Sequence, residues 1–173
     1  MTSKDQRQTD RAAALPVTIR AAGQADAAAI VGLVRALAAH VGDASQATVT
    51  AQAMAEAGGG DHPLWRGMVA EAGGTLVGIC LYSILYSTWV GGPGLYVIDL
   101  FVVPEFRAGQ LGRRLLAATA RQGRDHGCRF VRLEVDHRNS AAEGFYERLG
   151  FQKRTGDTIF MLKGDGFAAL TPG

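Results

Sequence analysis

The segment that most constrains the fold of this sequence is Leu95–Val103, a nearly continuous apolar run that ends at Pro104. Apolar runs of this length are typical of strands that are covered on both faces of a sheet. A turn containing glycine and arginine follows, and "LGRRLLAATARQGRDH" then has the pattern of an amphipathic helix that ends near Gly127. The segment therefore predicts a central strand that leads through a turn into a helix.

The turn "RAGQLGRR" combines successive backbone N–H groups with Arg107, Arg113 and Arg114, which favours binding of an anion such as phosphate. It is not a P-loop, because G-x-x-x-x-G-K-[ST] is absent, and it has only Gly109 and Gly112 of a dinucleotide-binding G-x-G-x-x-G. The phosphate-binding interpretation that remains is a strand end, a turn and a helix N-terminus acting together. An ordinary strand-to-helix turn with solvated arginines is the alternative that the turn alone leaves open.

Apolar periodicity along the rest of the chain predicts elements in the order of one α+β domain. The predicted strands cover residues 15–22, 63–72, 75–85, 95–103 and 129–136, with a closing hairpin over 151–163. The predicted helices cover residues 25–40, 47–57, 111–126 and 139–150. We therefore expect a flexible N-terminal tail over 1–14, a folded domain over 15–163 and a short C-terminal tail over 164–173.

The composition of the 173-residue chain is that of a soluble globular protein, with 47% hydrophobic and 20% charged residues. A net charge of +2 and the lack of a basic stripe argue against a nucleic acid as partner. Cys80 and Cys128 are far apart and lack a nearby histidine set, so we expect no metal site and a reducing compartment. No apolar run is long enough to span a bilayer, and the first residues lack the apolar block of a secretory signal. We therefore expect a cytoplasmic protein that does not act on a membrane.

Asp99 is the most informative carboxylate of the sequence. Strict alternation along the central strand places one acid and four large apolar side chains on the same face, namely Leu95, Val97, Asp99, Phe101 and Val103. Burying an unpaired carboxylate is costly, so an acid at this position needs either a function or backbone donors that satisfy it. Both interpretations of Asp99 stay open at this point.

Two further residues are candidates for an acceptor site. Glu134 belongs to a polar face that alternates with an apolar one, the six residues being Arg132, Glu134 and Asp136 against Val131, Leu133 and Val135. That polar face either lines a wet cavity or forms a surface with a salt bridge between Arg132 and Glu134. Trp89 lies in the predicted loop before the central strand, where it either walls an acceptor pocket or simply packs.

Two motifs resemble those of the GNAT superfamily of N-acetyltransferases. "LFVVPEFRAGQLGRRLL" resembles the acetyl-CoA motif V-x-P-x-x-R-x-x-G-x-G/A, and "NSAAEGFYERLGF" resembles the motif N-x-x-A-x-x-F-Y-x-x-L-G-F. The resemblance covers about residues 17–163. It implies the GNAT fold, an α+β fold with a mixed, mostly antiparallel central sheet flanked by helices. It also implies that acetyl-CoA binds in the splay between the fourth and fifth strands.

The stretch "YSTWVGGPGLYVIDLFVVPEFR" is similar to the branch containing the spermidine/spermine and diamine N-acetyltransferases. Three features depart from that pattern. Gln110 replaces a glycine of the acetyl-CoA turn, and we expect it to lack the positive φ that glycine provides. Ile98 replaces a glutamate of the branch, and "AHVG" replaces a tyrosine–glutamate pair, which weakens the expectation of a polyamine as acceptor.

The chemistry of acetyl transfer assigns further roles. An alkyl-ammonium has a pKa of about 10.4, so only about one amine in a thousand is neutral near pH 7 and a base or desolvation must help. Asp99 and Glu134 are the candidate catalytic carboxylates and, with Trp89, the candidate acceptor-binding residues. The resemblance implies that Tyr146 protonates the leaving thiolate and that a backbone N–H near Val102 stabilises the oxyanion. Without a Ser-His-Asp or Cys-His set, direct attack in a ternary complex is expected.

The acetyl-CoA site that the resemblance implies spans the strand end, the turn and part of the second motif. Its residues are Leu100, Phe101, Val102, Val103, Arg107, Ala108, Gly109, Gln110, Leu111, Gly112, Arg113, Asn139, Ala142 and Tyr146. Asn139 either caps its helix, contacts the CoA arm, or does both. We expect acetyl-CoA as co-substrate, no metal, a small primary amine (polyamine, diamine or amino-acid-like) as acceptor, and a homodimer as in the resembled branch. The alternatives are a protein or peptide N-acetyltransferase and a non-catalytic acyl-CoA-binding module.

Overall fold

The computed structural model describes residues 15–156 and 158–170, and the chain divides into two compact units. The first unit extends to Asp136 and the second begins at His137. The tail predicted over residues 1–14 lies outside the described residues, as does the end of the tail predicted over residues 164–173. No helix of the described residues is long and apolar enough to cross a membrane.

The first unit is built on a five-stranded sheet in the order β1-β2-β3-β4-β5. The strands are β1 Val17–Ala21, β2 Arg66–Ala72, β3 Thr75–Ser87, β4 Gly92–Val102 and β5 Val131–Leu133. The first four strands pair antiparallel with their neighbours, whereas β4 and β5 pair parallel. The expected mixed, mostly antiparallel sheet is therefore confirmed.

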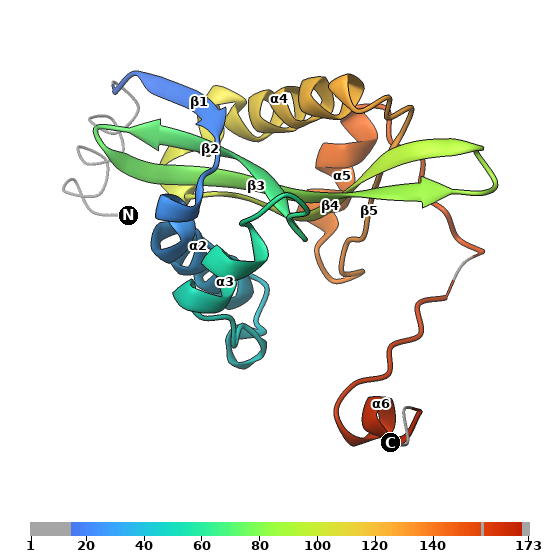
Figure 1. Ribbon diagram of the computed structural model, residues 1–173. Helices are drawn as coiled ribbons and strands as arrows, with labels where there is room; N and C mark the ends of the chain where they lie inside the picture. The colour runs from blue at the N-terminus through green and yellow to red at the C-terminus, as the bar shows by residue number, and fades with distance from the viewer. Residues whose placement is uncertain (1–14, 157, 171–173) are drawn as a thin grey trace. The chain divides into compact units, whose positions relative to one another are not determined.

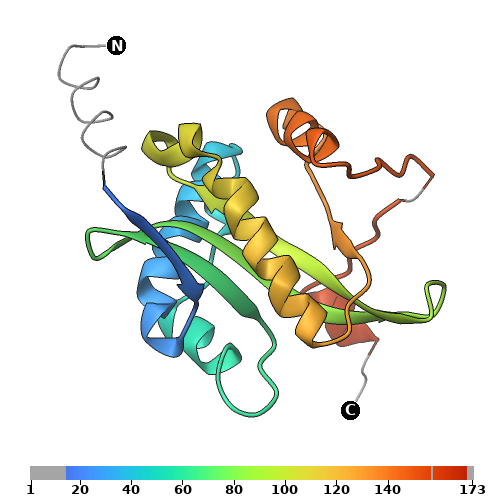
Figure 2. The ribbon, with the colours of Figure 1, turned by 90° about the horizontal axis from the view of Figure 1, so that it is seen from above.

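Helices cover both faces of this sheet (Figures 1 and 2). On one face lie α2 Ala27–His40 and α3 Ala51–Ala57, and on the other lies α4 Leu111–Asp125. Three short 3-10 helices connect them, namely η1 Gln24–Asp26, η2 Ala44–Gln46 and η3 Pro104–Gly109. The predicted helices over 25–40, 47–57 and 111–126 correspond to α2, α3 and α4, with α3 starting later because Thr50 caps it by accepting from Ala53 N–H.

The sheet separates two apolar cores. Under α2 and α3, the buried cluster joins helix residues to three strands, and its members include Ile30, Val31, Met54, Trp65, Val69, Ile79, Leu81 and Phe101. On the opposite face, α4 buries Leu111, Leu115, Leu116, Ala118, Thr119 and Gly123, which recur at three- and four-residue spacing. A Cβ at Gly123 would lie 2.5 Å from Leu95 Cδ1, so the close packing of α4 on β4 requires glycine there.

A β-bulge divides β4. Asp99 pairs with Leu81 on β3, but the next pair along β3 is Tyr82 with Val97, which leaves Ile98 as an extra residue. The bulge reverses the alternation: Leu95 packs against α4, whereas Phe101 belongs to the cluster under α2. The prediction of a single face from Leu95 to Val103 is therefore wrong, because period two holds only within each half of the strand.

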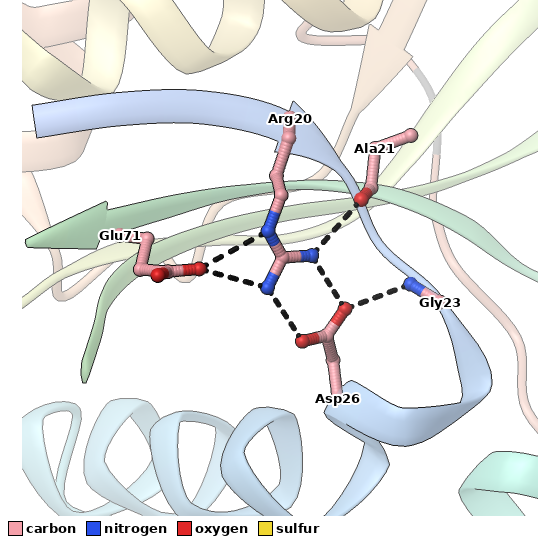
Figure 3. A network of polar contacts seen from close by, with 5 residues as sticks. All are labelled: Arg20, Ala21, Gly23, Asp26 and Glu71. Carbon is pink, nitrogen blue, oxygen red and sulfur yellow. Dashed lines mark hydrogen bonds and ion pairs between the residues drawn. The ribbon is translucent and has the colours of Figure 1, made fainter. Parts of the chain in front are cut away.

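A charge network joins β1, η1 and β2 (Figure 3). The Arg20 guanidinium lies 2.8 Å from both Asp26 carboxylate oxygens and 3.0 Å from Glu71 Oε2, and Asp26 also accepts from Gly23 N–H. The hydrogen bond from Arg20 is the main reason that the pKa of Asp26 is lowered. The Arg20 side chain is 41% exposed, so water screens the network and its contribution to stability is modest.

The second unit contains α5 Ser140–Arg148 and α6 Asp165–Ala169. Asn139 caps α5, since its side-chain oxygen accepts from Ala142 N–H at 3.1 Å, which confirms its expected capping role. The hairpin predicted over residues 151–163 is wrong, because the described part of that segment forms no strand. Residues such as Ile159 and Phe160 favour an extended chain, but a strand also needs a paired neighbour.

Candidate active site

The second half of β4 has an open edge. β5 pairs with β4 only between Leu95 and Val97, and no other strand of the described residues borders that edge. Val103 N–H donates to Val77 C=O on β3, so alternation turns the N–H and C=O groups of Leu100 and Val102 away from β3 and toward the open edge. This edge can therefore pair with an extended ligand that carries amide groups.

The predicted residues of this strand thus divide into two pairs. Leu100 and Val102 present backbone groups to the open edge, as described above. Phe101 and Val103 direct their N–H groups to β3 and pack their side chains against the cluster under α2. Only alternate residues of the predicted stretch are therefore placed to contact a ligand at this edge.

The turn after β4 places Gln110 at φ +54° and ψ +24°, in the left-handed region. The expectation that Gln110 lacks a positive φ is wrong, and it is the one non-glycine residue with this conformation among the residues that the structure describes. An L-residue in this region costs roughly 1–2 kcal/mol, so the rest of the turn holds Gln110 in place. The glycine-like path of the turn is kept although the glycine is not.

The same turn opens α4. Arg114 N–H donates to Gln110 C=O at 3.0 Å, so the N–H groups of Leu111, Gly112 and Arg113 have no acceptor within the helix by their position. Together with the helix dipole, these donors form a site suited to a phosphate. Ala108 and Gly109 belong to η3, which leads directly into this turn.

The three arginines around the turn point to different places. Arg113 Nη1 lies 3.4 Å from Gln110 Oε1 and stays at the helix start, whereas Arg114 Nη2 donates to Val17 C=O on β1. Arg107 Nε donates to Val102 C=O at 2.9 Å, at the open edge of β4. The structure therefore does not gather the three guanidinium groups around one anion.

Asp99 and Glu134 come together around Tyr96. Across the bulge, Asp99 and Tyr96 pair with Leu81 and Ser83 of β3, two residues apart, so both face the α2 side of the sheet. Burial raises the pKa of Asp99. The pKa of Tyr96 is raised first by burial and then by the charge and hydrogen bond of Glu134, with a smaller contribution from Asp99. The arrangement is a partly desolvated acidic cluster that can hold an ammonium group or take a proton from it.

The acidic cluster also contains the expected salt bridge, because Arg132 Nη2 lies 3.5 Å from Glu134 Oε1 on an exposed surface. Tyr96 is the residue that sequence reasoning missed. It lies three residues before Asp99, a spacing that strict alternation places on opposite faces, and nothing in the composition of the strand marks the bulge between them. A tyrosine so close to a candidate acid was the one available signal.

Trp89 stands apart from this cluster. It lies in the turn between β3 and β4, and its side chain is 94% exposed among the described residues. Such exposure argues against a packing role within the described chain, and the role of Trp89 as the wall of an acceptor pocket stays a prediction.

Tyr146 and Ala142 belong to α5 of the second unit, and Asn139 caps that helix. Tyr146 makes edge-to-face contacts with Phe145 and Phe151, at centroid distances of 5.1 and 5.4 Å. Phe151 N–H also donates to Tyr146 C=O, which fixes the chain as it leaves the helix. These contacts hold the Tyr146 ring in one orientation within its unit.

Comparisons with known proteins agree with these features. Residues 33–151 match the acetyltransferase (GNAT) family. The chain is 32% identical over 165 residues to the thialysine N-epsilon-acetyltransferase of Sus scrofa, an alignment that covers 89% of this chain and 96% of that protein.

Solved structures show the same fold. An integron cassette protein from the mobile metagenome of V. cholerae has a TM-score of 0.74 at 20% identity and covers 89% of this chain and 96% of its own. The aminoglycoside N-acetyltransferase AAC(6')-Iy in complex with CoA has a TM-score of 0.69 at 24% identity, with coverages of 86% and 95%. The family match and the length of the alignment to the thialysine enzyme establish that the chain belongs to the GNAT family of acetyltransferases.

Proposed function

We propose that this protein transfers the acetyl group of acetyl-CoA to the primary amine of a small molecule, by direct attack in a ternary complex. The observation that carries the proposal is the continuity between the open edge of β4 and the N-terminus of α4. The edge offers the amides of Leu100 and Val102, and the helix offers three N–H groups that have no acceptor within the helix. A pantetheine arm has amides for the first, and a pyrophosphate suits the second.

The acceptor site of the proposal is the cluster of Asp99, Glu134 and Tyr96. Two carboxylates attract a cationic amine, and burial of Asp99 raises its pKa toward the range in which a carboxylate accepts a proton more readily. The neutral amine then attacks the thioester carbon, and the Val102 N–H stabilises the oxygen that becomes negative. Tyr146 is the proposed acid that protonates the departing thiolate.

The acceptor class is proposed from the chemistry of the cluster and from the relatives. The name of the Sus scrofa protein specifies thialysine, a small amino-acid-like molecule with a distal primary amine. A compact acidic cluster suits one ammonium group on such a molecule. A longer polycation is less favoured, because Ile98 provides an apolar side chain, 44% exposed, where the polyamine branch has an acid.

The test is thiol release from acetyl-CoA by the purified protein with a panel of acceptors: thialysine, lysine, putrescine, spermidine, an aminoglycoside and short peptides. A blank without acceptor is needed, because Cys80 and Cys128 are free thiols. We expect turnover with thialysine or lysine and weaker turnover with spermidine. Turnover confined to peptides would contradict the small-molecule acceptor.

Variants separate catalysis from mere binding of acetyl-CoA. Tyr146→Phe should bind acetyl-CoA normally and lose about 100-fold in kcat, since a general acid contributes about that much. Asp125→Asn, at the exposed end of α4, is the control and should leave the rate unchanged. Binding of acetyl-CoA without turnover of any acceptor, and no effect of Tyr146→Phe, would favour an acyl-CoA-binding module instead.

A further inference from the structure

We infer that Arg107 is a positioning residue that fixes the open end of β4, and that its guanidinium is not a ligand of the CoA phosphates. The inference rests on the acetyl-CoA-dependent transfer proposed above. It concerns a residue that the sequence groups with the phosphate-binding turn but that the structure connects to the strand edge and to α2.

Three contacts define the position of the Arg107 side chain. Its Nε donates to Val102 C=O at 2.9 Å, its Cζ lies 5.6 Å from the centroid of the Phe101 ring, and its Nη1 lies 3.4 Å from His40 Nε2. The first is a hydrogen bond from a charged donor, and the second is a cation–π contact. The guanidinium thus reaches back to the residues at the end of β4 rather than forward to the start of α4.

The partners of Arg107 are themselves placed by the fold. Phe101 is 5% exposed and belongs to the core under α2, and the His40 ring contacts it at a centroid distance of 6.3 Å. His40 is the last residue of α2, where the helix dipole favours a nearby cation. Arg107 therefore joins the end of α2, the buried ring of Phe101 and the open edge of β4.

The contact to Val102 links Arg107 to the chemistry. A carbonyl on an unpaired strand edge needs a donor, and Arg107 supplies one at the last residue of β4. The N–H of Val102, the proposed oxyanion donor, belongs to the same residue and faces the same edge. The two peptide planes that carry this carbonyl and this N–H meet at the Val102 Cα, so a contact that holds the carbonyl restricts rotation at Val102 and thereby helps to hold the direction of the N–H. Oxyanion stabilisation is sensitive to small changes in donor direction.

Arg113 provides the matched comparison. Its Nη1 lies 3.4 Å from Gln110 Oε1 at the start of α4, and its own N–H is one of those that α4 leaves without a helical acceptor. If a guanidinium near this turn binds phosphate, Arg113 is the better placed of the two. The two arginines should then affect different kinetic constants.

The experiment measures kcat at saturating acetyl-CoA and the Kd for CoA in Arg107→Met, Arg107→Lys, Arg113→Met and Arg121→Met. Arg107→Met should lower kcat about 10- to 30-fold with the Kd within about twofold, since an interaction made in the transition state changes kcat. Arg113→Met should raise the Kd about tenfold and leave kcat unchanged. Arg121→Met, on the exposed side of α4, should change neither.

The lysine variant separates charge from geometry. Lysine keeps the positive charge but has neither the planar fork nor the stacking surface of arginine, so Arg107→Lys should recover only a small part of kcat. Full recovery by lysine, or a tenfold rise in the Kd for CoA in Arg107→Met with kcat preserved, would identify Arg107 as a phosphate ligand and overturn the inference. Unchanged kcat and Kd in Arg107→Met would overturn it as well.

A second measurement does not depend on turnover. The backbone amide resonances of Leu100, Val102 and Val103 should shift in Arg107→Met and stay in place in Arg121→Met, because only the first loses the contact to Val102. Unshifted resonances in Arg107→Met would contradict the positioning role even if no acceptor were found. Absence of turnover in the wild-type protein would count against the proposed function alone, because the resonance shifts still decide the role of Arg107.

Discussion

The two halves of β4 differ in what surrounds them although they form one strand. From Gly92 to Val97 the strand is bordered by β3 on one side, and between Leu95 and Val97 it is bordered by β5 on the other side. From Asp99 to Val102, β3 is the one strand of the described residues that borders it. The first half is therefore a structural strand and the second half is an edge that can bind a ligand.

The bulge at Ile98 is what separates the two halves. It reverses which residues face α4 and which face α2. Leu95 packs in the core under α4, whereas Asp99 lies on the α2 side of the sheet with Tyr96. One extra residue thus turns a carboxylate toward the acidic cluster and leaves the apolar packing of both halves intact. Substitutions of core residues in the first half, such as Leu95, should change stability, whereas substitutions of Asp99 and of Tyr96, which faces the same side across the bulge, should change activity.

The largest expected effect is on stability and comes from Leu95→Ala. Leu95 is 1% exposed and packs on α4 at Gly123, so the cavity should cost about 2–4 kcal/mol of unfolding free energy. Leu100→Ala is the matched control, because it is the same residue type on the same face but in the second, half-buried part of the strand. Urea unfolding of both variants checks the comparison, which fails if Leu100→Ala costs as much as Leu95→Ala.

Asp99→Asn, in the second half of β4, should change activity far more than it changes the binding of CoA. Loss of the carboxylate should lower kcat/KM for the amine about 100-fold, because a base or cation partner is removed without changing the shape of the side chain. The Kd for CoA should stay within about twofold, since the proposed CoA groups are backbone amides and the α4 N-terminus. A normal rate in Asp99→Asn would remove Asp99 from the acceptor site.

The buried carboxyl group of Asp99 should also make stability depend on pH, and Asp99→Asn should remove that dependence. Burial raises the pKa of Asp99 above its ordinary value of 3.8, so the folded state binds its proton more tightly than the unfolded state does. Ionisation of Asp99 therefore costs stability as the pH rises above 3.8, and the cost is complete once the pH exceeds the folded pKa. The stability of Asp99→Asn relative to wild type should therefore increase as the pH rises from 3.8 through the pKa of Asp99 in the folded state. Urea unfolding of both proteins, measured at steps of about one pH unit from about pH 4 to about pH 8, would detect the increase.

The sequence predicts the elements of the first unit better than the details that make its site. The apolar run, the amphipathic helix after it and the glycine turns define the order of strands and helices, because those patterns follow directly from burial. The bulge at Ile98 and the direction of the Arg107 side chain could not be predicted, since the first depends on how β3 and β4 pair and the second on contacts with Val102, Phe101 and the sequence-distant His40. The hairpin predicted over 151–163 failed for the related reason that composition alone does not supply a strand partner.

Tyr96→Phe tests whether the acidic cluster works as a unit. The substitution keeps the ring and removes the hydroxyl that hydrogen-bonds Glu134, so the expected effect is about a tenfold rise in the KM for the amine. Stability should change by less than about 1 kcal/mol, because the ring still packs. Tyr86→Phe, on an exposed tyrosine near the end of β3, is the control and should behave as wild type. An unchanged KM in Tyr96→Phe would show that Glu134 needs no support from this hydroxyl.

The smallest expected effect is that of Gln110→Gly. Glycine adopts the left-handed conformation of residue 110 without steric cost, which favours the folded state. It also makes the unfolded chain more flexible, which opposes folding, so the net gain in the free energy of unfolding should be about 0.5–1 kcal/mol. The open edge of β4 is unchanged by the substitution, so kcat should stay within about twofold. Urea unfolding and the kinetics of the same preparation check both statements. A loss of stability would mean that the Gln110 side chain, through its contact with Arg113, contributes more to the turn than its backbone conformation costs.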